Sequence, residues 1–103
     1  MDVVSERLQL PKLSELCRKY GVVRLSAFGS VVRDDFGERS DVDLVVDFEP
    51  VRELTASKQY FGFMFELEDL YGRMVDFVER QGVRNPVFKA SLEEQEVNVF
   101  AAK

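Results

Sequence analysis

The segment that most constrains the fold is an apolar run interrupted by carboxylates at residues 41–48. It reads Asp-Val-Asp-Leu-Val-Val-Asp-Phe and is followed by Pro50, so it predicts a β-strand over residues 42–48. Side chains alternate between the faces of a strand, which places Asp41 and Asp43 on one face and most of the apolar residues on the other. Two carboxylates this close repel each other unless a cation lies between them, and such oxygen ligands suit Mg²⁺. Taken alone, an Asp-x-Asp pair is common and more often marks the end of a turn followed by an exposed strand residue.

Apolar spacing and turn residues predict two further strands and three helices. The strands are expected over residues 22–28 and 74–79, and the helices over residues 10–20, 52–71 and 86–93. Gly72 suits a helix C-cap, and Asn85-Pro86 suits a helix start. No element is assigned to the tail that ends at Lys103. Helices alternating with strands predict a small α/β (α+β) domain, with a three-stranded mixed sheet and helices packed on one face.

Composition limits the possible chemistry and the possible partners. The 103 residues fit a single domain over residues 1–103, and a net charge of −5 argues against duplex nucleic acid as a partner. No run approaches the roughly 20 apolar residues that span a bilayer, and the single cysteine, Cys17, fits a reducing compartment, so a cytoplasmic protein without a membrane partner is expected. The absence of histidine excludes histidine-based catalysis and leaves carboxylates as the metal ligands.

Two further features extend the candidate site. Asp76 lies in the apolar run 74–78, where a buried, unpaired carboxylate would be costly; either a bound metal or a position on an edge strand would explain it. Gly29-Ser30 ends the first expected strand, where backbone N–H groups can bind phosphate oxygens or simply form a turn. Arg33 follows and could either neutralise phosphate charge or pair with a neighbouring aspartate.

Together these segments resemble the DNA polymerase beta-like nucleotidyltransferases and, more narrowly, the minimal nucleotidyltransferase (MNT) proteins. The shared pattern is Gly-Ser, a spacer, and Asp-x-Asp-Leu, followed by a third carboxylate on a later strand. In this sequence the pattern reads Phe28-Gly29-Ser30, then Ser40-Asp41-Val42-Asp43-Leu44, then Gly72-Arg73-Met74-Val75-Asp76-Phe77. The resemblance covers nearly the whole chain and implies the polymerase beta-like nucleotidyltransferase fold.

The resemblance also implies a reaction, in which two Mg²⁺ ions assist the transfer of AMP from ATP to a hydroxyl group. It implies metal-binding and catalytic roles for Asp41, Asp43 and Asp76, and nucleotide-binding roles for Gly29, Ser30, Arg33 and Ser40. Of the aspartates, the first two would bind both ions, and the third would bind one ion and help to activate the incoming hydroxyl. The Asp34-Asp35 pair departs from the family pattern, and we expect it to alter the loop and not the chemistry.

A protein partner is implied as well. MNT proteins are typically antitoxins encoded beside a HEPN ribonuclease toxin, which they bind and modify by transferring AMP to a tyrosine. On the expected long helix, large apolar residues occupy consecutive positions and cannot all face the core. One stripe is expected to pack inward and holds Leu54, Phe61, Met64 and Phe65. The other is the candidate partner surface and holds Tyr60, Phe63 and Leu67.

Several alternatives remain open from the sequence. The long helix can be enclosed within the domain or form a homodimer contact instead of binding a different protein. The chain can neutralise its partner by binding alone, without using its nucleotide chemistry. It can also act on a small molecule or on RNA, although the acidic charge makes these acceptors less favourable.

Overall fold

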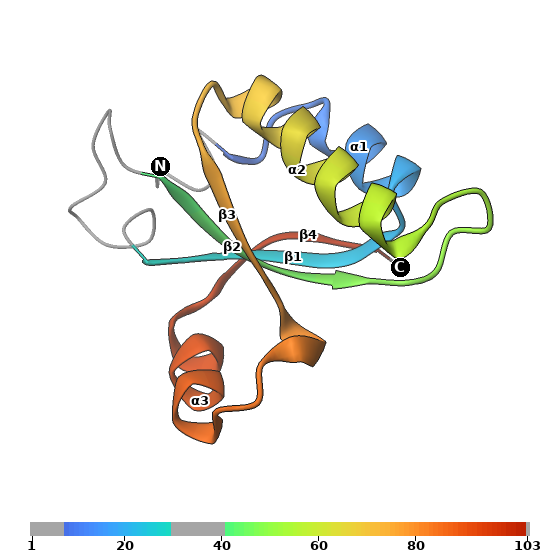
Figure 1. The fold of residues 1–103 in the computed structure, drawn as a ribbon. Coiled ribbons are helices and arrows are strands. Elements are labelled where there is room, and N and C mark those ends of the chain that lie inside the picture. Colours follow the sequence, from blue (N-terminus) through green and yellow to red (C-terminus); the bar gives the residue numbers. More distant parts are fainter. Residues whose placement is uncertain (1–7, 30–40, 103) are drawn as a thin grey trace.

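The computed structural model describes residues 8–29 and 41–102, which form a four-stranded sheet with helices on both sides (Figure 1). In chain order the elements are α1 (Leu13–Lys19), β1 (Val22–Phe28), β2 (Val42–Phe48), α2 (Ala56–Tyr71), β3 (Val75–Glu79), η3 (Arg80–Gly82), α3 (Pro86–Gln95) and β4 (Val97–Ala101). The order across the sheet is β3-β2-β1-β4, so β3 and β4 are the edge strands. β1 pairs antiparallel with both β2 and β4, whereas β2 and β3 are parallel and are connected through α2.

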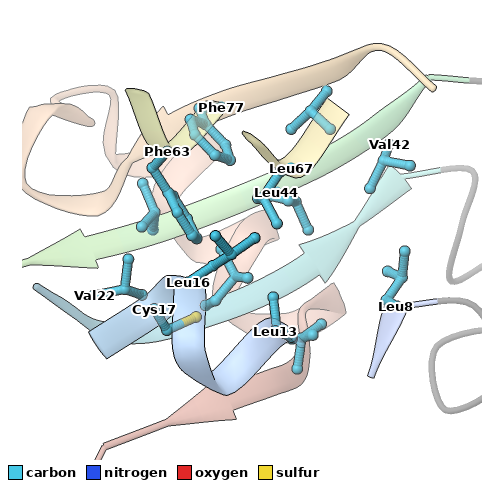
Figure 2. Packing of buried hydrophobic residues seen from close by; sticks show 14 of the residues in the cluster. Leu8, Leu13, Leu16, Cys17, Val22, Val42, Leu44, Phe63, Leu67 and Phe77 are labelled. Atoms are coloured by element: carbon cyan, nitrogen blue, oxygen red, sulfur yellow. The ribbon is translucent and has the colours of Figure 1, made fainter. Parts of the chain in front are cut away.

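The main hydrophobic core lies between the sheet and the helices α1 and α2 (Figures 1 and 2). Phe63 and Leu67 of α2 are fully buried there, together with Leu44 of β2 and Cys17 of α1. The Phe63 ring stacks on Phe77 of β3, with the ring centroids 5.4 Å apart. Burying side chains of this size stabilises a fold by about 2 kcal/mol each. This core therefore holds β2 and β3 in place from one side and leaves their other side available for a site.

Capping residues determine where the helices begin and end. β1 and β2 span the ranges predicted for them, but α2 begins at Ala56 and not at residue 52, because the Thr55 hydroxyl caps it by accepting a hydrogen bond from a backbone N–H of the first turn. Gly72 ends α2 with a φ of 65°, and Asn85 caps α3, as predicted. No helix in the described part of the chain is both long and apolar enough to cross a membrane.

The α/β class is confirmed, but the structure differs from the predicted three-stranded sheet in two details. First, β4 adds a fourth strand from the tail; it is a five-residue edge strand, VNVFA, whose only buried residue is Val99. Second, α3 lies on the opposite side of the sheet from α1 and α2, so the helices do not all pack on one face (Figure 1). Leu92 is the buried residue of α3, and Val45, which alternation places on that same side, is also fully buried.

The prediction for the two stripes of α2 is wrong for four phenylalanine and leucine positions, whereas Leu54 and Met64 of the expected inward stripe do pack against the core. Phe63 and Leu67, proposed for a partner surface, have no exposed area, whereas Phe61 and Phe65, expected to pack inward, are 48% and 61% exposed. Tyr60 is half-buried and packs against the core. The reason is a tertiary contact: Gly62 lies so close to the ring of Tyr20, at the end of α1, that an added Cβ would be 2.7 Å from it. With this side of α2 against Tyr20, the neighbouring Phe63 packs on the rings of Tyr20 and Phe77 in the core.

Candidate active site

β2 and β3 bring two of the predicted carboxylates together. In the parallel register Asp43 lies directly opposite Asp76, so both side chains are on the same face of the sheet. The preceding pair in the register, Val42 and Val75, is buried in the core on the other face. The side-chain alternation predicted for both strands is therefore confirmed. Asp43 is half-buried, whereas Asp76 is exposed on the edge strand.

Gly29 follows the end of β1 and lies against Asp43. Its backbone has a φ of 73°, in the left-handed region that favours glycine. A Cβ added at this position would be only 2.5 Å from Asp43 Oδ2. The absence of a side chain at Gly29 therefore makes room for the Asp43 carboxylate. The other predicted nucleotide-binding residues, Ser30, Arg33 and Ser40, lie outside the described residues.

Asp41 immediately precedes β2 and is exposed. The backbone N–H of Val42 donates a hydrogen bond of 2.9 Å to the carbonyl of Met74, which fixes the start of β2 beside the segment that leads into β3. Within residues 8–29 and 41–102, however, no three carboxylate or cysteine side chains lie close enough together to hold a metal ion. The structure thus brings Asp43 and Asp76 together and does not join Asp41 to them in one cluster. The in-register pair still offers two anionic oxygen ligands, a donor set that fits a hard divalent cation.

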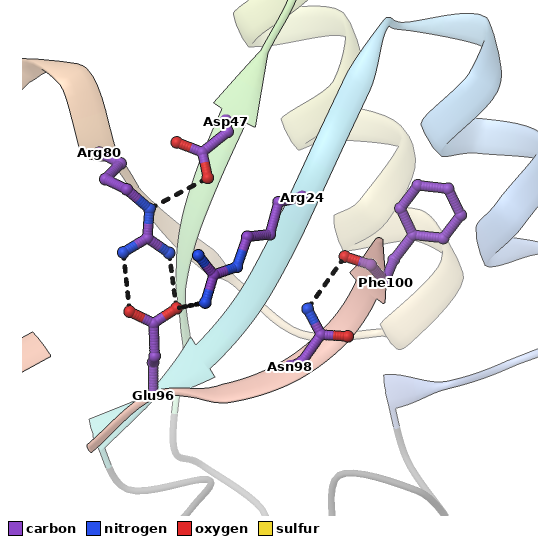
Figure 3. A network of polar contacts seen from close by, with 6 residues as sticks. All are labelled: Arg24, Asp47, Arg80, Glu96, Asn98 and Phe100. Atoms are coloured by element: carbon purple, nitrogen blue, oxygen red, sulfur yellow. Dashed lines mark hydrogen bonds and ion pairs between the residues drawn. The ribbon is translucent and has the colours of Figure 1, made fainter. Parts of the chain in front are cut away.

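A second polar cluster lies on the same face, farther along β2 (Figure 3). The Arg80 guanidinium donates a hydrogen bond of 3.0 Å to Asp47 and two more, of 2.7 and 2.5 Å, to the oxygens of Glu96. Arg24 of β1 also donates to Glu96, at 3.0 Å. Only 6% of the Glu96 side chain is exposed, and the hydrogen bonds from Arg80 hold the pKa of its carboxyl below the usual value.

The sequence alone gave no reason to single out these four charged residues, because each is an ordinary charged side chain until the strands are paired. Glu96 lies just before β4, and Arg80 begins η3 directly after β3. The ion pairs therefore link segments next to the two opposite edges of the sheet, across the face that carries Asp43. Since the carboxylates and guanidinium groups satisfy one another, we assign the cluster a structural role.

Comparison with known proteins shows to which family the chain belongs. The model of the nucleotidyltransferase domain family matches residues 12–98, a range that includes Gly29, Asp41, Asp43 and Asp76. The chain belongs to the nucleotidyltransferase domain family. This nucleotidyltransferase therefore carries its in-register aspartates and its glycine turn inside the region that defines the family.

Similar individual proteins indicate the subgroup of this family that the chain resembles. The nucleotidyltransferase is 36% identical over 80 residues to the protein adenylyltransferase MntA of Thermococcus cleftensis, a match that covers 78% of each chain. A solved structure provisionally assigned as a minimal nucleotidyltransferase superposes with a TM-score of 0.73 and 32% identity, covering 94% of this chain and 95% of that one. A chain from the complex of a tri-AMPylated Shewanella oneidensis HEPN toxin with its MNT antitoxin shares the fold, with a TM-score of 0.63, 17% identity and coverage of 94% and 73%. The resemblance to the minimal nucleotidyltransferases is confirmed.

Proposed function

We propose that this nucleotidyltransferase binds a HEPN-type ribonuclease toxin and transfers AMP from ATP, with Mg²⁺, to a tyrosine hydroxyl of that toxin. The observation that carries the proposal is the in-register pair of Asp43 and Asp76, with the Asp43 carboxylate in the space that the missing side chain of Gly29 leaves. A pair of carboxylates that can hold a divalent cation is a part that phosphoryl transfer requires. Two relatives support the acceptor: one is named a protein adenylyltransferase, and one fold relative comes from a complex with an AMPylated HEPN toxin.

In this proposal Asp41, Asp43 and Asp76 would hold Mg²⁺, which would supply charge stabilisation for the transferred phosphate. Gly29 and Ser30 bind the triphosphate through their backbone N–H groups. The tyrosine oxygen attacks the α-phosphorus, a new O–P bond forms, and the bond from the α-phosphorus to the bridging oxygen breaks as pyrophosphate leaves with the electron pair. Asp76 is exposed on the edge strand, so its carboxylate is open to an approaching hydroxyl and accepts its proton.

The proposal is tested by incubating the purified protein with ATP, Mg²⁺ and a candidate HEPN partner protein, and measuring intact masses. We expect the toxin to gain the mass of one or more AMP groups on tyrosine. Replacing both Asp41→Asn and Asp43→Asn should abolish the gain, because it removes the anionic ligands. The variant Glu93→Gln, which alters an exposed acid on α3 far along the chain from the site, should leave the gain unchanged. An unchanged mass gain with the double variant would contradict the assigned mechanism.

Neutralisation by binding alone is the second candidate function. It is favoured by one observation, that Asp41 does not complete a cluster of three carboxylates in the described part of the chain. The double aspartate variant separates the two functions. If it binds the toxin and suppresses its ribonuclease activity as well as the wild type does, contact is sufficient; if it binds and does not suppress the activity, transfer of AMP is required.

A further inference from the structure

Glu68, in the last turn of α2, contacts both ends of the short connection that leads into β3. Its backbone carbonyl accepts a hydrogen bond of 2.8 Å from the N–H of Gly72, which ends the helix with a φ of 65°. Its side-chain Oε2 accepts a second hydrogen bond, of 3.1 Å, from the backbone N–H of Val75, the first residue of β3. One residue of the helix is therefore bonded to the beginning of the next strand.

The peptide group between Met74 and Val75 is held from both sides. On the side of β2, the N–H of Val42 donates a hydrogen bond of 2.9 Å to the Met74 carbonyl. The carbonyl and the N–H of one trans peptide point in opposite directions, so the Val75 N–H points away from β2. β3 is an edge strand of the described sheet, and an edge strand leaves such N–H groups without a neighbouring strand. The Glu68 carboxylate supplies the acceptor that a further strand would otherwise provide.

The backbone at Val75 directly precedes Asp76, which lies opposite Asp43 in the register of β2 and β3. The side chain of Asp76 is exposed, so the position of its carboxylate depends on the β3 backbone and not on packing around it. Val75 and Phe77, on either side, are buried and keep the strand on the core. The hydrogen bond to Glu68 adds to these core contacts a fixed direction for the peptide that leads into Asp76.

We propose that Glu68 is a positioning residue, whose carboxylate holds the first peptide of β3 and thereby keeps the Asp76 carboxylate beside that of Asp43 for a divalent cation. The proposal rests on the proposed function, because it assigns a residue that supports the same site. Glu68 belongs to α2, on the side of the sheet opposite Asp43 and Asp76 (Figure 1), and among residues 8–29 and 41–102 it joins no group of three side chains that could hold a metal ion. It therefore acts through the backbone of β3 and not as a ligand. Replacing residues that support ligands in this way typically costs about 10- to 100-fold in metal affinity or activity.

Substitutions at Glu68 and at the neighbouring Asp69 test the proposal. Glu68→Met removes the acceptor oxygen but keeps a long side chain of similar helix propensity, and Glu68→Ala is a second variant without the acceptor. Glu68→Gln removes the charge and keeps an oxygen that can accept from the Val75 N–H. Asp69→Asn, at the next and exposed position of α2, removes one charge and is the matched control. A role of the hydrogen bond separates Glu68→Met from Glu68→Gln, whereas a role of the charge makes them alike.

Each purified protein is compared with the wild type by its amide exchange, its metal affinity and its rate. Exchange of the Val75 amide hydrogen is followed by NMR, the dissociation constant of Mn²⁺ is measured by electron paramagnetic resonance without nucleotide, and kcat is measured for AMP transfer to the HEPN partner. We expect Glu68→Met and Glu68→Ala to speed the exchange, to raise the Mn²⁺ dissociation constant and to lower kcat, the last two by roughly tenfold or more. Glu68→Gln and Asp69→Asn should stay close to the wild type in all three. Urea unfolding curves confirm that the molecules compared are folded.

The outcomes separate the positioning role from the proposed function. If the wild type transfers AMP and both variants without the acceptor keep its Mn²⁺ affinity and its kcat, the positioning role is overturned while the proposed function stands. Equal effects of Glu68→Met and Glu68→Gln, or of Asp69→Asn, also overturn the positioning role, because the charge and not the hydrogen bond is then responsible. If the wild type transfers no AMP, but only the variants without the acceptor exchange faster and bind Mn²⁺ more weakly, the positioning role stands and the catalytic function fails. A wild type that neither binds Mn²⁺ nor transfers AMP contradicts both.

Discussion

At the scale of single residues, two glycines with the same backbone conformation allow the site to be tested separately from the fold. Gly29 and Gly72 have φ values of 73° and 65°, so alanine at either position costs about 1 kcal/mol of folding free energy. An added Cβ meets Asp43 Oδ2 at 2.5 Å in one case and nothing within 4 Å in the other. We therefore expect Gly29→Ala to lower the rate of AMP transfer by roughly 100-fold through displacement of the carboxylate, and Gly72→Ala to keep the wild-type rate. Equal rates for the two variants, measured beside their urea unfolding curves, would show that the contact with Asp43 has no role in the reaction.

The sequence could predict some of these residue positions and not others. Strand alternation was sufficient to place Asp43 and Asp76 on one face, because the intervening apolar residues specify the opposite face strongly. It did not reveal that Asp41, one position before β2, stays outside a common cluster in the described structure, since alternation gives a direction and no distance. The close approach of Gly29 to Asp43 depends on the pairing of β1 with β2, which a linear motif does not contain.

At the scale of elements, the apolar pattern of the sequence did not predict the inward face of α2 or the strand β4. Six consecutive apolar or glycine positions in α2 permit more than one inward stripe, and tertiary contacts, those of Gly62 with Tyr20 and of the Phe63 ring with the core, accompany the observed one. β4 is a short edge strand with a single buried residue; its valines and Phe100 favour a strand, but its pairing with β1 is a long-range contact that the sequence does not contain. By contrast, β1 and β2 have several buried residues each, and both were predicted with the observed bounds.

The packing of α1 on α2 gives a prediction at this same scale. In Gly62→Ala the new Cβ would lie 2.7 Å from the Tyr20 ring, so the ring or the helix has to move. We expect the free energy of unfolding to fall by about 1–2 kcal/mol, although alanine is intrinsically the better helix former. Gly82→Ala is the control, because an added Cβ there meets nothing within 4 Å. Urea denaturation of both variants provides the measurement, and a gain in stability for Gly62→Ala would mean that helix propensity outweighs the contact.

At the scale of the whole molecule, one carboxylate links segments next to the opposite edges of the sheet. Glu96, immediately before the edge strand β4, binds Arg80, which follows the other edge strand β3, and Arg24 in between (Figure 3). Asp47 of β2 completes the network. The network lies on the face that carries Asp43 and Asp76, where α1 and α2 provide no cover. It therefore stabilises the side of the sheet that the main core does not reach.

This network makes stability depend on pH in a defined direction. Because the hydrogen bonds from Arg80 lower the pKa of Glu96 in the folded state, its contribution is fully present above the usual pKa of 4.5 and is lost as the pH falls through the lower folded-state value. We expect Glu96→Gln to reduce the free energy of unfolding by about 2 kcal/mol at pH 7, less than for a fully buried pair because Arg80 keeps its contact with Asp47. The difference from the wild type should shrink as the pH is lowered below 4.5, whereas Glu94→Gln, at an exposed position two residues earlier, should give almost no difference at either pH. Urea titrations from pH 7 to pH 3 measure this dependence, and a difference that stays constant over that range would mean that the ionised carboxylate does not hold the two edges together.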